Sequence, residues 1–172
     1  MKNKYLWVAA IAGIVLVLDQ LTKQLVMAHI PRHGTVPVVH GFFDLINVRN
    51  PGAAFGFLAG VQSAWRTAFF LAVSTAALVV IAVLVRKSAD RLSIVAFSLI
   101  GGGAVGNLVD RVRFGEVVDF IDWYYRTWHW PAFNIADSAI TVGVGLLAIE
   151  MLFPHRRLPE EGAEEGQRHH HE

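Results

Sequence analysis

The chain has 172 residues, of which 54% are hydrophobic and 17% are charged, and its formal net charge is +1. The apolar share exceeds that of an ordinary soluble domain, and the small net charge offers no footprint for nucleic-acid binding. Because the sequence has no cysteine, disulfide bonds, a thiol nucleophile and thiolate metal ligands are excluded. We therefore expect a single integral-membrane domain over residues 1–158.

Four apolar stretches have the length that a helix needs to cross a hydrocarbon core of about 30 Å. We predict transmembrane helices at about residues 6–29, 64–85, 92–108 and 135–153. The first stretch could also be a signal peptide, but Asp19 and Lys23 stand where a cleavage site needs small residues, so we expect a retained helix. The polar segment 159–172 is expected to be disordered.

The connection after the first helix is rich in β-branched and aromatic residues, as in TVPVVHGFFDLINV, which predicts strands. We expect a small amphipathic sheet over about residues 35–58, lying on the outer face of the bilayer between helices 1 and 2. The segment NPGAAFGF predicts a tight turn, because Pro51 fixes φ and Gly52 permits unusual angles. The predicted fold class is therefore an all-α membrane protein with four transmembrane helices and a small extracytoplasmic β-sheet.

The orientation in the membrane follows from lysines and arginines in the short flanks of the helices. These residues gather at the N-terminus, between the second and third helices and after the fourth, although arginines in the outer connections weaken the bias. The opposite side holds the aromatic residues expected of an interfacial belt, namely Trp65, Trp123, Tyr124, Tyr125, Trp128 and Trp130. We therefore expect both termini in the cytoplasm.

The third helix contains the string Gly101-x-Gly103-x-x-Gly106, which matches the letters of a dinucleotide-binding fingerprint. The string follows an apolar helix and not a strand, so the context for nucleotide binding is missing. Gly102 and Gly106, four residues apart, instead predict a close helix–helix contact in lipid.

Two acidic residues in the helices have a functional and a structural interpretation. Asp19 lies within the first helix, where an ionisable group often marks a functional site, but it can equally form an ion pair with Lys23 one turn later. Asp110 is expected to end the third helix with a local ion pair at the headgroups. Its neighbour Arg111 can bind a lipid phosphate or a backbone carbonyl.

Asp119 and Asp137 are the strongest candidates for chemistry. Asp119 stands among apolar residues in VVDFI, and taken alone it could be an outward-facing strand position. Asp137 follows Asn134 by three residues, and taken alone the two could simply cap the fourth helix. Both are expected at the same outer boundary, and two converging carboxyl groups cannot both ionise, which yields an acid and a base in one site. Such a pair can hydrolyse an amide without a metal.

Other hydrolytic arrangements have little support in the sequence. Neither an H-E-x-x-H zinc motif nor a G-x-S-x-G nucleophile elbow occurs. A serine–lysine pair built from Ser138 and Lys23 stays possible.

Five motifs in order resemble those of the bacterial lipoprotein signal peptidases (signal peptidase II). DQLTK at 19–23 resembles the family's D-x-x-T-K, and NPGAAF at 50–55 resembles N-x-G-A-A-F. Three further segments are similar to G-N-x-x-D-R, V-D-F and F-N-x-A-D, namely GNLVDR at 106–111, VDF at 118–120 and FNIAD at 133–137. The resemblance covers nearly the whole chain.

The resemblance implies an aspartyl protease of the bacterial inner membrane that removes signal peptides from prolipoproteins carrying diacylglycerol on the acceptor cysteine. It implies Asp119 and Asp137 as the catalytic pair, and as residues lining the site it implies Asn50, Asn107, Arg111, Asn134 and Asp19. It also implies inhibition by peptide antibiotics of the globomycin type. No metal or cofactor is expected, and one chain is expected to suffice for a site.

Two other classes of protein stay open on the residues alone. A small proton- or ion-coupled transporter subunit would use Asp19, Asp119 and Asp137 as a relay, although the acidic residues gather on one face and form no path across the membrane. A structural membrane subunit would use the same residues as helix caps and ion pairs, and it would tolerate Asp119→Asn.

Overall fold

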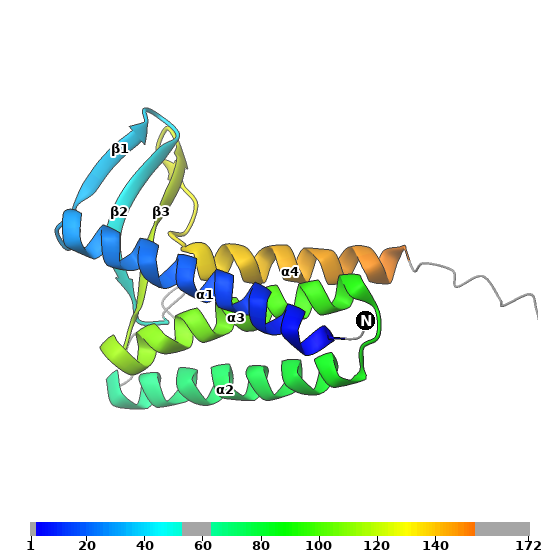
Figure 1. Cartoon of the computed structure of the whole chain (residues 1–172). Helices are drawn as coiled ribbons and strands as arrows, with labels where there is room; N and C mark the ends of the chain where they lie inside the picture. Colours follow the sequence, from blue (N-terminus) through cyan, green and yellow to red (C-terminus); the bar gives the residue numbers. More distant parts are fainter. Residues whose placement is uncertain (1–2, 53–62, 154–172) are drawn as a thin grey trace, which may run out of the picture.

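The computed structural model describes residues 3–52 and 63–153, and it contains the four predicted helices. Each helix is long and apolar enough to cross a membrane. Their bounds are α1 Lys4–His29, α2 Ser63–Lys87, α3 Arg91–Phe114 and α4 Ile135–Leu152. The helices run side by side, with the sheet at one end of the bundle (Figure 1). The expected disorder of the tail, residues 159–172, falls outside the described residues.

The third helix is longer than the sequence predicted. It continues past Asp110 to Phe114 and ends at Gly115, whose φ of 74° is the left-handed conformation that glycine adopts readily at a helix end. The prediction that the helix ends near residues 108–110 was wrong because Asp110 is buried and paired with a lysine of α1. Because Lys23 neutralises the charge of Asp110, the helix can continue past this residue.

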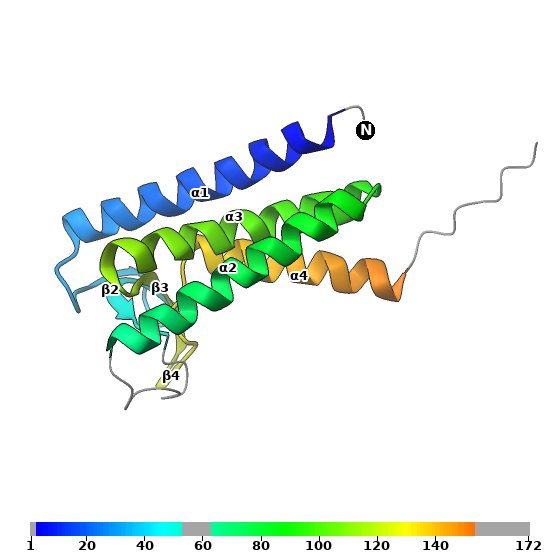
Figure 2. The same ribbon diagram turned by 90° about the horizontal axis from the view of Figure 1, so that it is seen from below.

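Helix α3 lies at the centre of the bundle and packs against the other three helices (Figure 2). Its glycines allow the close approach. A Cβ built on Gly102 would lie 2.9 Å from Cα of Ala12 on α1, and one on Gly103 would overlap the carbonyl oxygen of Ala136 on α4. This confirms that the glycine string serves helix packing.

The sheet has four antiparallel strands in the order β1-β2-β3-β4. Their bounds are β1 Thr35–Val39, β2 Phe43–Asn50, β3 Val117–Tyr125 and β4 Trp128–His129. Only β1 and β2 come from the connection between α1 and α2, so placing the whole sheet there was incomplete. A lone two-stranded hairpin is marginal, and β3 completes it by pairing along β2.

The pairing of β2 with β3 brings the two long connections to the same end of the bundle (Figure 1). The turn expected at NPGAAFGF begins within the described residues. Gly52 has a φ of 89°, and its N–H donates to Oδ1 of Asn50 at 2.8 Å. The rest of that segment, residues 53–57, falls outside the described residues.

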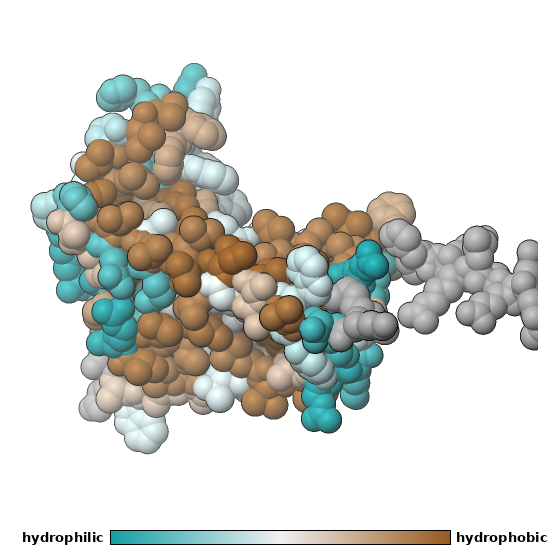
Figure 3. Space-filling model, in the orientation of Figure 1, coloured by the Kyte–Doolittle hydropathy of each residue, from teal (hydrophilic) through white to brown (hydrophobic). Residues whose placement is uncertain are grey.

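The surface of the bundle is apolar along the helices. Figure 3 shows hydrophobic residues over the bodies of the helices and hydrophilic ones gathered towards the ends. Large side chains such as Ile14, Leu21 and Leu25 of α1 are more than half exposed. Exposure of this kind on a helix suits contact with lipid.

Candidate active site

Asp119 is buried in the middle of the sheet, at the end that meets the helices. It lies on β3 opposite Val48 of β2, and only 2% of it is exposed. Its Oδ1 accepts a hydrogen bond from Nδ2 of Asn134 at 2.7 Å, and its Oδ2 accepts one from Nδ2 of Asn50 at 3.0 Å. The outward-facing strand position considered from the sequence is therefore wrong, because the side chain points into a polar interior.

Asp137 is the third residue of α4 and takes part in its capping box. Its backbone N–H donates to Oδ1 of Asn134 at 2.9 Å, and its own Oδ2 accepts from the backbone N–H of Asn134 at 3.3 Å. Its Oδ1 accepts from Nδ2 of Asn107 at 2.8 Å. Asp137 therefore caps α4 and also belongs to the site.

Asn134 joins the two carboxyl groups, which we call the carboxyl pair (Asp119 and Asp137). It is fully buried, and its side-chain amide contacts both acids, since Nδ2 donates to Asp119 while Oδ1 accepts from the backbone of Asp137. The same Nδ2 lies 3.2 Å from Oδ1 of Asn107. Residues from α3, α4, β2 and β3 therefore converge on one small polar volume.

The ionisation of Asp119 is strongly perturbed. Burial raises the pKa of its carboxyl group from 3.8 to about 7, and the nearby negative charge of Asp137 acts in the same direction. The hydrogen bonds from Asn50 and Asn134 and the charge of Lys23 act in the opposite direction. A carboxyl group of this pKa exchanges its proton near neutral pH, as a general acid or base must.

A second group of charged residues is linked to the carboxyl pair through Asn107, and we call it the lysine cluster (Asp19, Lys23 and Asp110). Nζ of Lys23 lies 2.9 Å from Oδ2 of Asp19 and 2.8 Å from Oδ2 of Asp110. All three residues are at most 1% exposed. The predicted Asp19–Lys23 pair is present, whereas the partner of Asp110 is Lys23 and not a group at the headgroups.

Asp19 and Asp110 also hold backbone from outside their own helices. Oδ1 of Asp19 accepts from the N–H of Ala136 at 3.0 Å, and Oδ2 of Asp110 accepts from the N–H of Val118 at 3.1 Å. Each acid therefore fixes a residue next to one member of the carboxyl pair. Asp19 itself has no exposed surface.

Arg111 lies at the edge of the site and is half-buried. Its guanidinium group stacks over the ring of Phe70 on α2 at 5.1 Å from the centroid, and its Nη1 lies 3.5 Å from the carbonyl oxygen of Asn107. The charges of Asp137 and Asp119 both act on it. Arg111 therefore offers donors beside the carboxyl pair without a tight partner of its own among the described residues.

Comparison with known proteins identifies the family. A family model described as signal peptidase (SPase) II matches residues 11–153. The chain belongs to the signal peptidase II family. It is 50% identical to the lipoprotein signal peptidase of Nitratidesulfovibrio vulgaris over 163 residues, which are 94% of this chain and 98% of that one. It is also 50% identical to the lipoprotein signal peptidase of Geobacter metallireducens, with 91% and 97% covered.

Solved structures agree with this assignment. A bacterial membrane enzyme solved by the in meso method at 2.3 Å resolution matches with a TM-score of 0.78 and 34% identity, covering 91% of this chain and 94% of that one. A second, solved at 1.9 Å, matches with a TM-score of 0.75 and 36% identity, covering 86% and 93%. The family is one of lipoprotein signal peptidases, so the protein is a multi-pass membrane peptidase, and the transporter and structural-subunit interpretations are set aside.

The geometry also decides against a serine–lysine pair for this member of the family. Oγ of Ser138 donates to the carbonyl oxygen of Asn134 at 2.9 Å. Nζ of Lys23 is occupied by two carboxylates and by Oδ1 of Asn107 at 3.1 Å. Each of the two side chains therefore contacts other groups, and Lys23 does not contact Ser138 among the described residues. Within residues 3–52 and 63–153, no group of three or more His, Cys, Asp or Glu side chains is arranged to hold a metal ion.

Gln20 is a site residue that the sequence did not reveal. Its Nε2 donates to Oδ1 of Asp110 at 3.0 Å and lies 3.2 Å from both Oδ2 of Asp19 and the carbonyl oxygen of Gly106. It therefore ties α1 to α3 beside the lysine cluster. A polar residue next to Asp19 in an apolar helix was the available signal.

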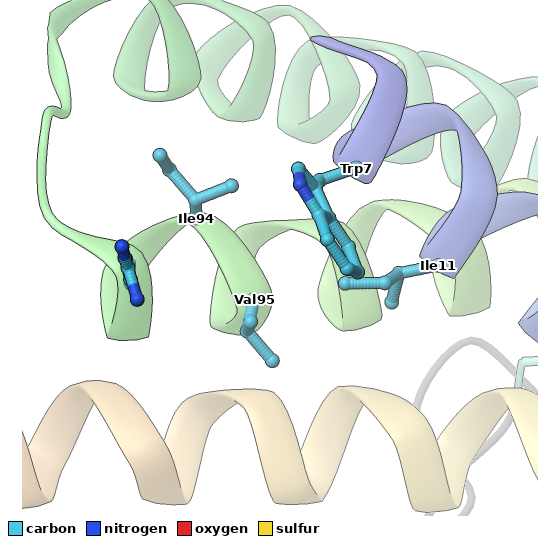
Figure 4. Close-up of a pocket in the computed structure, with 5 residues that line it drawn as sticks. Trp7, Ile11, Ile94 and Val95 are labelled. Carbon is cyan, nitrogen blue, oxygen red and sulfur yellow. The ribbon is translucent and has the colours of Figure 1, made fainter. Parts of the chain in front are cut away.

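A separate pocket of about 340 Å³ lies at the other end of the bundle. Trp7 and Ile11 of α1 and Ile94 and Val95 of α3 line it, together with Arg91 (Figure 4). These side chains are apolar apart from the arginine. The pocket offers no group suited to amide hydrolysis and is distinct from the carboxyl pair.

Proposed function

We propose that the protein is an aspartic endopeptidase that removes the signal peptide from diacylglyceryl-modified prolipoproteins, cutting just before the lipidated cysteine. The observation that carries this proposal is the carboxyl pair, in which the buried Asp119 and the half-buried Asp137 share Asn134 and receive hydrogen bonds only from amide groups among the described residues. Asp119 and Asp137 are the catalytic residues. The proposed reaction requires no metal or cofactor.

The reaction divides the roles of acid and base between the two carboxyl groups. Burial raises the pKa of Asp119 to about 7, so the pair keeps a proton near neutral pH, and one carboxyl group is the acid while the other is the base. The base takes a proton from water, whose oxygen attacks the scissile carbonyl carbon while the acid protonates the carbonyl oxygen. Collapse of the tetrahedral intermediate breaks the C–N bond, and a proton from the pair goes to the leaving amine of cysteine.

Polar residues around the pair suit the binding of substrate backbone. Asn50, Asn107, Asn134 and Arg111 provide amide and guanidinium donors at a depth where an unpaired peptide group is costly. Asp19 contributes by supporting this arrangement through the lysine cluster. Peptide antibiotics of the globomycin type are expected to occupy the same site and block cleavage.

The placement in the membrane follows from the same substrate. We infer that the protein lies in the bacterial inner membrane with both termini in the cytoplasm and the carboxyl pair at the outer face. The exposed aromatic residues Trp65, Trp123, Tyr125 and Trp128 lie at that end, as an interfacial belt would. A lipidated precursor then enters sideways from the bilayer with its scissile bond near the headgroups. One chain contributes every residue of the site, which suits a monomer.

The test is cleavage of a diacylglyceryl-cysteine prolipoprotein by purified protein. The wild-type protein is expected to release the signal peptide, and Asp119→Asn and Asp137→Asn are each expected to lower kcat by about 10²- to 10⁴-fold, the usual contribution of general acid–base catalysis. Both variants should keep the wild-type fold. Full activity in either variant removes that residue from the mechanism, and equal cleavage of an unlipidated precursor contradicts the proposed substrate.

A further inference from the structure

Lys23 is a buried lysine whose hydrogen-bonding capacity is fully used. An ammonium group has three donors, and Nζ of Lys23 has three acceptors within 3.1 Å, from Asp19, Asp110 and Asn107. One carboxylate would be sufficient to neutralise the charge, and the cluster has two. The third contact, to the side chain of Asn107, links the lysine cluster to the carboxyl pair.

Asn107 transmits the position of Lys23 to Asp137. Its Oδ1 accepts from Lys23 at 3.1 Å and from Asn134 at 3.2 Å, and its Nδ2 donates to Asp137 at 2.8 Å. Rotating this amide by half a turn would set its oxygen against the carboxylate of Asp137 and its NH₂ against the ammonium of Lys23. Both contacts would be repulsive, so the lysine selects one of the two amide orientations.

We propose that Lys23 is a positioning residue for the peptidase reaction, holding the amide of Asn107 in the orientation that donates to Asp137. The proposal rests on the proposed function, because it assigns a role within the same carboxyl pair. It explains why a lysine, and not an apolar residue, occupies a fully buried position in a membrane helix.

The charge of Lys23 also reaches Asp119. The charged groups near this carboxyl group are Asp137 from α4, Lys23 and Asp19 from α1, and Asp110 and Arg111 from α3. Among these charges, Asp137 and Lys23 shift the pKa of Asp119. Of these, Lys23 lowers the pKa of Asp119. Loss of the lysine is therefore expected to raise that pKa and to move the alkaline limb of the pH profile of kcat to higher pH.

The informative variant is Lys23→Met combined with Asp110→Asn. With Asp19 kept, the lysine cluster carries one net negative charge both before and after the change, and the new amide can still accept from the N–H of Val118. The hydrogen bond to Asn107 is lost. If the double variant does not fold, a triple variant that also carries Asp19→Asn takes its place in the experiment. The triple variant leaves no charge in the lysine cluster.

Lys4→Met is the matched control. Lys4 also makes three hydrogen bonds, to the carbonyl oxygens of Val85, Arg86 and Ser88, but at the opposite end of α1. Its loss is expected to lower thermal stability while leaving kcat and the pH profile unchanged. The control therefore separates a general loss of stability from an effect on the site.

The double variant is expected to fold, to lose about 10- to 100-fold in kcat with KM within about twofold, and to show the alkaline limb at higher pH. A kcat and pH profile equal to those of the Lys4→Met control would overturn the proposal. Loss of activity only in proportion to loss of folded protein, with the alkaline limb in place, would also overturn it. Failure of the proposed function has a different signature, namely full cleavage by Asp119→Asn.

Discussion

Two pairs of carboxyl groups lie side by side in this protein, and they differ in what they bind. Asp19 and Asp110 share the ammonium of Lys23 at 2.9 and 2.8 Å. Asp119 and Asp137 receive hydrogen bonds only from amide N–H groups among the described residues, mainly those of Asn50, Asn107 and Asn134. Burial is similar for three of the four, so burial alone does not decide the role of an acid.

The nature of the donor explains the difference. A cation compensates the charge of a carboxylate, whereas a neutral amide orients the group and leaves much of the cost of burial in place. Acids of the first kind support the structure. Acids of the second kind can still exchange a proton, which is what hydrolysis requires.

Removing the shared cation should have the largest effect on stability. Lys23→Met alone leaves Asp19 and Asp110 buried and facing each other without a counterion. We expect a loss of about 3–5 kcal/mol in the free energy of unfolding, as for other broken buried ion pairs. Thermal unfolding in detergent measures this loss, and adding Asp110→Asn should recover part of it. An unchanged unfolding temperature would contradict the supporting role of the cluster.

Replacing an acid of the other pair should change stability in the opposite direction. The pKa of Asp119 rises from 3.8 in an unfolded chain to about 7 in the folded protein, so the stability that comes from its bound proton is complete below about pH 4 and is lost as the pH rises to about 7. Asparagine has no carboxyl group to ionise, so the Asp119→Asn variant does not lose this stability as the pH rises.

At pH 8 we therefore expect Asp119→Asn to be more stable than the wild-type protein by about 1–4 kcal/mol, and the gap should close as the pH falls to 4. Unfolding temperatures measured across this range provide the check. A constant difference between the two proteins at every pH would mean that Asp119 does not hold a proton in the folded state.

Crowding the lysine cluster should have a smaller effect. A Cβ at Gly106 would lie 2.6 Å from Oδ2 of Asp19, so Gly106→Ala is expected to displace that carboxylate and cost about 1–3 kcal/mol. Gly145→Ala on α4 is the matched control, since its Cβ would have no neighbour within 4 Å. It should leave stability unchanged or raise it by up to about 1 kcal/mol. Equal behaviour of the two variants would argue against the tight packing described for Gly106.

The smallest change in the free energy of unfolding is expected for an exposed ion pair. Arg32 and Glu116 meet at 3.2 Å, and the arginine side chain is 60% exposed. Glu116→Gln is expected to change the unfolding free energy by less than about 1 kcal/mol, because solvent screens such pairs. A loss as large as that of Lys23→Met would show that ion pairs in this protein depend little on burial.

The helices could be predicted from the sequence because long apolar runs have few alternatives in a membrane. The sheet was only half predicted, since VVDFID looks equally like a loop or a strand until β2 is beside it. The acids of the carboxyl pair could be singled out as isolated charges in apolar surroundings. The contact between Lys23 and Asp110 could not, because 87 residues of chain separate them and only helix packing brings them together.

Asn134 closes the first turn of α4 and at the same time holds Asp119 and Asp137, with the same few amide atoms. Fraying of that turn would remove a hydrogen bond from each acid at once, while Asn50 would still donate to Asp119 and Asn107 to Asp137. The start of α4 and the geometry of the carboxyl pair are therefore coupled through one side chain.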